Sequence, residues 1–271
     1  MVSGGDLART VFDRQARVAM TRTRSWREFW EGETPIYVNE RHTLLHYRLI
    51  ARDILDAIND LPASPPRDDG PGSDDAATSL RPVVLDQGCG EALSADEIAA
   101  RCERLYLCDA AASVRERLRA RFAPTKNIVV INPVEVADLS EASVNLVVAN
   151  SLVQYLTRPE LASVLRLWRH VLKPQGRLLL SDVPARGASP VTDATALLRF
   201  GWRGGFLFAA LGGLARTALS DYRKLRAELG FASYDEAEAL ALLAEAGFSA
   251  RRHRPNLGHN QARMAFLATP V

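Results

Sequence analysis

Two aspartates and a glycine turn carry the residue types and spacing that could bind a nucleoside. Asp86 ends an apolar run, and Gly88 and Gly90 follow it. Glycines let the backbone turn sharply and approach a ligand closely. A second apolar run ends at Asp109, 19 residues after Gly90, where nucleotide-binding folds place an acid that binds ribose hydroxyls. An ordinary strand-to-helix turn is the alternative.

The turn departs from a dinucleotide-binding loop at two positions. The third glycine of that motif is replaced by Ala92, and Glu91 lies where a pyrophosphate would approach. A carboxylate there repels phosphate but tolerates a cation, so we expect a cationic nucleoside without phosphates. Cys89 is expected to fill the crowded turn as a small residue, because no histidine adjacent in sequence could activate it as a nucleophile.

Polar side chains cluster at residues 37–46, ahead of the main fold. His42 and His46 are four residues apart and share a face if a helix has begun. Three interpretations are open: a metal site, which needs further ligands; the polar start of a helix; or a lid whose Tyr37 and Arg41 cover the cofactor or touch the substrate. The sequence predicts no complete metal site.

A second polar cluster, residues 259–263, precedes the last apolar run. It is either a turn exposed to water or part of the acceptor site. In the second case His259 is a general base, Arg263 is an anion clamp, and Asn260 contacts the substrate.

Residues 184–233 exceed what a minimal α/β unit needs. We expect them to form a helical cap, because they follow a strand on the ligand-binding side of such sheets. Its apolar residues are Phe200, Trp202, Phe206, Phe208 and Leu211, and the cap also contains Arg199, Arg203 and Arg216. A packed helical hairpin, an apolar acceptor pocket and a membrane-surface patch are all open.

Short apolar runs alternate with helical stretches from residue 82 onward, which predicts an α/β fold with a doubly wound, mostly parallel sheet. The last two runs are expected to form an antiparallel edge. Helices are predicted over 7–30 and from Leu44 to Ile58. The predicted division is an N-terminal helical lid segment (1–61), a flexible loop (62–81) and the main domain (82–271) with its cap.

Composition narrows the functional classes. The formal net charge is +2, which gives no argument for nucleic-acid binding. The three cysteines lack metal-ligand spacing and favour a reducing, cytoplasmic setting. We expect no secretory signal and no transmembrane helix.

Five stretches together resemble class I S-adenosylmethionine-dependent methyltransferases: VVLDQGCGEAL, LYLCDAA, VNLVVANSLVQYL, WRHVLKPQGRLLLSDV and LLAEAGF. The first four span residues 82–183 in the family's order. The resemblance implies a Rossmann-like sheet of seven strands, with S-adenosyl-L-methionine as cofactor.

The resemblance also implies a cofactor site. Its members are Asp86, Gly88, Cys89 and Gly90 around the methionine part, Asp109 at the ribose, Ala110 near the adenine, Pro133, Val134 and Glu135 facing the adenine ring, and Asn150 and Ser151 beside the methyl-donating centre. The candidates on the acceptor side are Tyr37, His42 and His259 for catalysis, and Tyr155, Trp202, Asn260 and Arg263 for substrate contact. The sequence departs from the family pattern at Ala92, at Pro133 and at Asn145, and we expect Asn145 to be structural.

Two functions are compatible with these features. The first is methylation of the oxygen or nitrogen of a small-molecule acceptor, including a hydrophobic or lipid-like one, with peripheral membrane contact through the cap and a homodimer left open. The second is a non-catalytic S-adenosylmethionine-binding or regulatory protein that retains the fold. The sequence does not name the acceptor.

Overall fold

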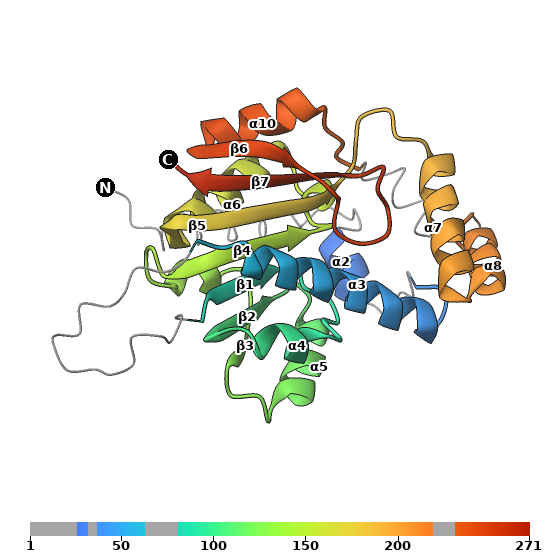
Figure 1. The fold of residues 1–271 in the computed structure, drawn as a ribbon, viewed down its shortest axis with the longest axis horizontal. Helices are drawn as coiled ribbons and strands as arrows, with labels where there is room; N and C mark the ends of the chain where they lie inside the picture. Colours follow the sequence, from blue (N-terminus) through green and yellow to red (C-terminus); the bar gives the residue numbers. More distant parts are fainter. Residues whose placement is uncertain (1–25, 32–36, 63–80, 219–230) are drawn as a thin grey trace, which may run out of the picture.

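The computed structural model of the chain describes residues 26–31, 37–62, 81–218 and 231–271. Its centre is a seven-stranded sheet with the strand order β3-β2-β1-β4-β5-β7-β6 (Figure 1). Strands β1 to β5 pair in parallel, whereas β7 pairs antiparallel with both β5 and β6. The predicted seven-stranded, mostly parallel sheet and its antiparallel edge are confirmed.

Helices and strands alternate along the chain as the sequence predicts. The strands are β1 (Val83–Gln87), β2 (Arg104–Cys108), β3 (Ile128–Ile131), β4 (Val144–Asn150), β5 (Leu172–Val183), β6 (Phe248–His253) and β7 (Met264–Pro270). The α-helices are α2 (Trp26–Glu31), α3 (Glu40–Asn59), α4 (Ala95–Ala99), α5 (Ala112–Phe122), α6 (Arg158–Val171), α7 (Pro190–Gly204), α8 (Leu207–Ala218) and α10 (Glu236–Glu245). Two 3-10 helices are η1 (Glu135–Asp138) and η2 (Val153–Tyr155). Most of the helix predicted over 7–30 and of the loop predicted over 62–81 lies outside the described residues.

Helices cover both faces of the sheet and bury two apolar clusters. Helices α3, α4 and α5 pack on one face, where Ile54, Ile98 and Leu118 are buried against residues of β1 and β2. Helices α6 and α10 pack on the other face, with Trp168 and Leu243 in the cluster. Because both faces are covered, the parallel strands are almost uniformly apolar.

Helix α3 begins four residues before the apolar spacing predicts. Its N-cap is Asn39, whose side chain accepts a hydrogen bond from the backbone N–H of His42 (2.8 Å). The sequence signal starts at Leu44 because the first turn is polar. The earlier start places His42 and His46 in the helix, one turn apart on the same face.

Asn145 has the structural role that the sequence predicts for it. Its Oδ1 accepts hydrogen bonds from the backbone N–H of Val83 (3.0 Å) and from Lys173 Nζ (2.9 Å). It therefore joins β4 to the start of β1 and to the start of β5, at the opposite end of the strands from the predicted site.

The carboxyl ends of the parallel strands point toward one end of the molecule. The cap helices α7 and α8 and the first turns of α3 lie at this end, at the right in Figure 1. Gly205 takes a left-handed conformation (φ 73°) between the two cap helices, which lets the chain reverse. Among the described residues, no helix is both long and apolar enough to cross a membrane.

Ala142 offers a test of the backbone geometry away from the site. It is an exposed turn residue with φ 52°, a left-handed conformation that disfavours a side chain. Ala142→Gly should raise the free energy of unfolding by about 0.5–1 kcal/mol. Chemical denaturation measures it, and exposed Ala120→Gly within α5 should lower stability by a similar amount. A loss of stability in Ala142→Gly would contradict the described turn.

Candidate functional site

The glycine turn after β1 is closed by its own hydrogen bonds. The backbone N–H groups of Gly88 and Cys89 both donate to the Cys108 carbonyl (2.7 and 3.2 Å). The N–H of Gly90 donates to Asp109 Oδ2 (3.0 Å), and that of Glu91 donates to the Tyr47 hydroxyl (2.9 Å). A pyrophosphate loop must instead aim its N–H groups at the ligand. This turn therefore offers no such donors from Gly88 to Glu91.

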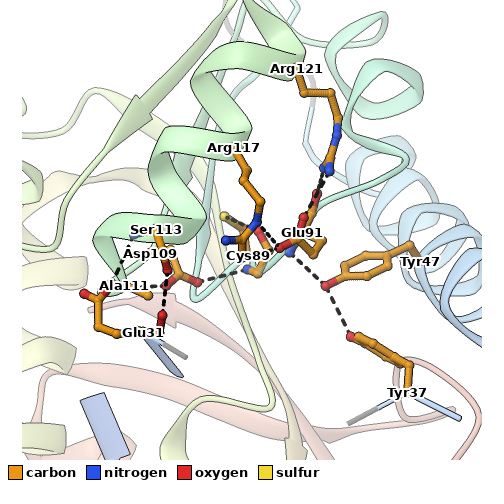
Figure 2. A network of polar contacts seen from close by, with 11 residues as sticks. Glu31, Tyr37, Tyr47, Cys89, Glu91, Asp109, Ala111, Ser113, Arg117 and Arg121 are labelled. Carbon is orange, nitrogen blue, oxygen red and sulfur yellow. Dashed lines mark hydrogen bonds and ion pairs between the residues drawn. The ribbon is translucent and has the colours of Figure 1, made fainter. Parts of the chain in front are cut away.

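The sequence argument from the charge of Glu91 is wrong. Glu91 turns away from the loop toward α5, where Arg117 Nη2 (2.6 Å) and Arg121 Nη2 (3.0 Å) form ion pairs with its carboxylate (Figure 2). Burial disfavours the charged form, but the hydrogen bonds from both arginines prevail and lower the pKa of Glu91. Its charge is thus neutralised locally. The case against a pyrophosphate rests on the occupied N–H groups instead.

Ala92 and Cys89 keep the turn compact. Ala92 stands where a dinucleotide loop has its third glycine, yet it takes a glycine-like conformation with φ 42°. The Cys89 side chain is buried in the cluster beneath the turn, and burial raises the pKa of its thiol well above the ordinary value. Cys89 thus fits the predicted packing role, and its thiol donates to the Gly90 carbonyl within the turn (3.7 Å).

Asp109 joins the turn to the next strand and is the most constrained acid of the site. Its Oδ2 accepts the Gly90 N–H, and its Oδ1 accepts the Ala111 N–H (2.9 Å). Burial raises the pKa of Asp109, against the opposing effect of the two N–H donors and of Arg115. A carboxylate has about four lone-pair sites, so two remain for ribose hydroxyls.

Asp86 lies behind the turn at the end of β1. Its side chain is buried, and no hydrogen bond to it occurs among the described residues. Burial, and next the nearby Asp109, raise the pKa of Asp86 to about 7. A buried carboxyl group without a partner suits a cationic ligand group such as an ammonium.

The N-terminal segment reaches the turn from two sides. Tyr37 donates its hydroxyl hydrogen to the Tyr47 hydroxyl (3.2 Å), which in turn accepts the Glu91 N–H (Figure 2). On the other side, the Glu31 carboxylate accepts the N–H groups of Ala112 (2.7 Å) and Ser113 (3.2 Å) at the start of α5. Helix α2 is thereby held beside Asp109.

Asn150 and Ser151 lie at the carboxyl end of β4, next to the end of β5. Asn150 Oδ1 accepts a hydrogen bond from Ser181 (2.8 Å), and Ser151 Oγ donates to Asp182 Oδ2 (2.6 Å). Gln154 follows in η2. Its Nε2 donates to the Ser151 carbonyl, while its Oε1 is buried and has no partner within the described ranges. The predicted cofactor edge is therefore polar.

Two other predicted regions flank this edge. The ring of Tyr155 packs against Trp26 and Trp30 of α2, with centroids 4.9 and 5.6 Å away. Beyond β3, Pro133 and Val134 are partly buried in a turn in which Glu135 Oε2 accepts the Asn132 N–H (2.6 Å). Ala110 is exposed directly after Asp109.

Three histidines from distant segments meet above the carboxyl ends of the strands. His42 and His46 lie on α3, and His259 comes from the loop before β7; their ring centroids are 6.0–6.1 Å apart. Burial is the main cause that lowers their pKa values, to about 4, about 3 and about 4 respectively. All three are neutral at physiological pH. Within the described ranges, no three His, Cys, Asp or Glu side chains are placed to hold a metal ion.

Arg263 does not act as a free anion clamp. Its Nε and Nη2 both bind the Asp193 carboxylate of α7 (3.2 and 2.8 Å), which also accepts a hydrogen bond from Asn260 Nδ2 (2.9 Å). The predicted substrate contacts Arg263 and Asn260 thus hold the cap. Arg41 likewise donates to the Gly204 carbonyl at the end of α7, so it anchors the cap.

Trp202 is a correction to the predicted acceptor site. Its side chain is 75% exposed, whereas Phe200, two residues earlier on α7, stacks on His259 with a centroid distance of 4.6 Å. Two helical positions differ by about 200° around the axis, so the two rings lie on opposite faces. Phe206 stacks on His42 (5.1 Å) and completes the aromatic wall.

Part of the chain is similar to known proteins. Residues 84–176 match the family model described as a methyltransferase domain. The match runs from β1 to the start of β5 and includes the glycine turn and Asp109, so this part of the chain is similar to a methyltransferase domain. No curated protein sequence matches it significantly.

Two solved structures have a similar fold. One is a chain from the complex of the Haloferax volcanii Trm112 methyltransferase activator, with 11% identity, a TM-score of 0.53, and coverage of 92% of this chain and 99% of the other. The second is an S-adenosylmethionine-dependent methyltransferase from Leishmania major, with 10% identity, a TM-score of 0.53, and coverage of 90% and 80%.

The residues present fit S-adenosylmethionine, the cofactor that the sequence resemblance implies. Asp109 keeps acceptor capacity for ribose hydroxyls, and Asp86 is a buried acid that an ammonium can neutralise. The buried Arg115 Nε, beside Asp109 and Ala110, and Gln154 Oε1 have no hydrogen-bond partner among the described residues. Buried polar atoms without partners are rare, so a ligand is a natural partner for them.

Sequence reasoning missed three residues of this region: Asp182, Asp193 and Tyr47. Asp182 had a signal, because it closes an apolar strand just as Asp86 and Asp109 do. Asp193 and Tyr47 had none, since their roles depend on contacts with residues 70 and 44 positions away.

The raised pKa of Asp86 gives a pH-dependent prediction. The folded chain binds this proton more tightly than the unfolded chain, so the contribution of Asp86 to stability is full below about pH 4 and is lost as the pH rises through about 7. Asp86→Asn removes this loss. Thermal unfolding without cofactor, measured across that window, should show the wild type falling relative to the variant. A constant difference between the two proteins would contradict the buried, unpaired acid.

Proposed function

We propose that the chain transfers a methyl group to the oxygen or nitrogen of a small-molecule acceptor. The observation that carries the proposal is the cluster above the ends of β4 and β5. It combines aromatic walls with buried polar atoms that have no partner in the part of the chain that the structure describes, namely His42 Nε2, His46 Nδ1 and Arg263 Nη1. Small-ligand sites combine apolar walls with a few placed polar groups in this way.

The cofactor side and the acceptor side take different residues in this proposal. Bound S-adenosylmethionine supplies an electrophilic methyl group on a sulfonium. Asp109 and Ala110 hold the nucleoside, while Asp86 and the turn from Gly88 to Gly90 hold the methionine part. Asn150 and Ser151 lie beside the methyl group and separate the two sides. The adenine ring faces the turn of Pro133, Val134 and Glu135.

Catalysis rests on positioning and on the exclusion of water. His259 is neutral at pH 7 and can accept a proton, although its lowered pKa makes it a weak base. His42 is also neutral, but its Nδ1 accepts the Val38 N–H (3.2 Å), so its Nε2 carries the ring proton and acts as a hydrogen-bond donor. Burial raises the pKa of Tyr37 to about 12, so Tyr37 acts as a hydrogen-bond donor to Tyr47 and not as a base. Tyr155 closes the site beneath α2.

Loss of Asp109 tests the cofactor side. Asp109→Ala removes a charged acceptor from two N–H groups and from the ribose, so the affinity for S-adenosylmethionine should fall about a hundredfold. Calorimetric titration with S-adenosylmethionine and S-adenosylhomocysteine measures it. Glu116→Ala, at an exposed position on α5, is the matched control and should retain the wild-type affinity.

Turnover distinguishes the enzyme from a non-catalytic binder. Formation of S-adenosylhomocysteine is followed with a panel of hydroxyl and amine acceptors of different size. Turnover of any of them supports the proposal. Tight cofactor binding without turnover on the whole panel would favour a regulatory protein that retains the fold.

A second part of the proposal concerns the outer face of the cap. We propose that this face contacts an anionic membrane surface, from which the chain takes a hydrophobic acceptor. Trp202 and Phe208, on adjacent helices, are 75% and 87% exposed, and Leu211 is also exposed. Arg199 and Arg203 are exposed on α7. Aromatic side chains with basic neighbours are typical of interfacial helices. Three buried free cysteines support a reducing, cytoplasmic location for this contact.

Vesicle flotation tests the membrane contact. The chain should float with vesicles that contain equal parts phosphatidylglycerol and phosphatidylcholine, and not with phosphatidylcholine alone. Trp202→Ser with Phe208→Ser should weaken flotation by roughly tenfold or more, because two large apolar side chains no longer insert. Val271→Ser, at another exposed apolar position, is the control. A homodimer that the double variant dissociates, without vesicle binding, would contradict this proposal.

A further inference from the structure

Asp182 stands out on the acceptor side by its backbone. It lies at the carboxyl end of β5, beside Ser151 at the end of β4, and both take left-handed conformations, with φ values of 54° and 55°. Such conformations in residues other than glycine cost free energy and cluster at functional sites. The two residues therefore form a strained pair at the edge between the proposed cofactor and acceptor positions.

Two segments of the chain hold this pair in place. Ser151 Oγ donates to Asp182 Oδ2 (2.6 Å), and the Asp182 N–H donates to Asn256 Oδ1 (2.9 Å). Asn256 is itself buried, and its Nδ2 donates to the carbonyls of Leu257 and Asn260. These hydrogen bonds fix both the side chain and the backbone of Asp182.

The charges around Asp182 decide what can bind there. Arg263 is 8% exposed and contributes one positive charge, which Asp193 neutralises through two hydrogen bonds. His42, His46 and His259, which belong to the acceptor side in the proposed function, are neutral at physiological pH. Two carboxylates face one guanidinium, so the acceptor side carries a net negative charge when Asp182 is ionised.

We propose that Asp182 binds the proton-bearing group of the methyl acceptor, so that the chain takes hydroxyl or amine acceptors and excludes anionic ones. This inference rests on the proposed function and names its substrate class. The acceptor heteroatom attacks the methyl carbon while the carbon–sulfur bond breaks and sulfur keeps the electron pair. The acceptor proton passes to the Asp182 carboxylate, which its hydrogen bond from Ser151 keeps oriented toward the reacting atoms.

The unpartnered Nη1 of Arg263 completes this recognition. It is buried and has no hydrogen-bond partner in the described part of the chain. A neutral oxygen of the acceptor satisfies it, whereas a second carboxylate would be repelled by Asp182 and Asp193. Phe200 and Phe206 supply the apolar wall for the rest of the acceptor.

Three matched probes test the inference on the full chain saturated with S-adenosylhomocysteine. Benzylamine, benzyl alcohol and benzoate share a ring and differ in charge. Saturation-transfer NMR should show binding of the amine and the alcohol, with benzoate roughly tenfold weaker or more, as expected for an unpaired like charge. Benzoate binding as tight as that of the amine would overturn the proposal.

Two isosteric variants test whether Asp182 and Asp193 cause this selectivity for charge. Asp182→Asn retains the shape and suits the left-handed conformation, because asparagine tolerates it. It should weaken benzylamine binding and leave the affinity for S-adenosylhomocysteine unchanged. Asp193→Asn should free the charge of Arg263 and let benzoate bind. Unchanged selectivity in both variants would contradict the role of Asp182, whereas loss of S-adenosylhomocysteine binding by the wild type would contradict the proposed function itself.

Discussion

The hydrogen bonds of Asp109 with Gly90 and Ala111 are the constraint on which the site depends. They tie the turn after β1 to the end of β2, so the two strands present one surface to a nucleoside. The remaining N–H groups of the turn are satisfied by Cys108 and Tyr47. A turn whose donors are already used cannot bind a pyrophosphate, but a carboxylate with spare lone pairs can bind ribose. The turn therefore disfavours a pyrophosphate because its N–H groups are occupied, and Asp109 favours a ribose because its carboxylate has free lone pairs.

The N-terminal segment extends this constraint to the acceptor side. Tyr47 holds the turn from α3, and the same helix carries His42 and His46 into contact with the cap. Arg41 anchors the end of α7, and Arg263 anchors its first turns through Asp193. Motion of α3 would therefore change the cofactor turn and the acceptor walls together. Polar residues near positions 40, 190 and 260 lie in one region because α3, the cap and the loop before β7 contact one another.

The sequence predicted the sheet well because the first four strands are short apolar runs separated by helical stretches, and β5 and β7 each contain such a run. The individual contacts were harder to predict. The partners of Glu91 lie 26 and 30 residues away on α5, so its charge was given the wrong role. Trp202 was chosen over Phe200 because the rotation of α7 about its axis is set by packing with α3 and α8. Ala92 showed no glycine signal, although its backbone adopts a glycine-like conformation.

The turn with its occupied N–H groups, together with Asp86 and Asp109, selects a cationic nucleoside without phosphates. Competition calorimetry on the intact chain tests this selectivity most directly, with S-adenosylmethionine titrated in the absence and in the presence of a large excess of NAD. The account predicts one binding event with S-adenosylmethionine whose affinity NAD does not alter. Binding of NAD that displaces S-adenosylmethionine, or no binding of S-adenosylmethionine, would contradict it.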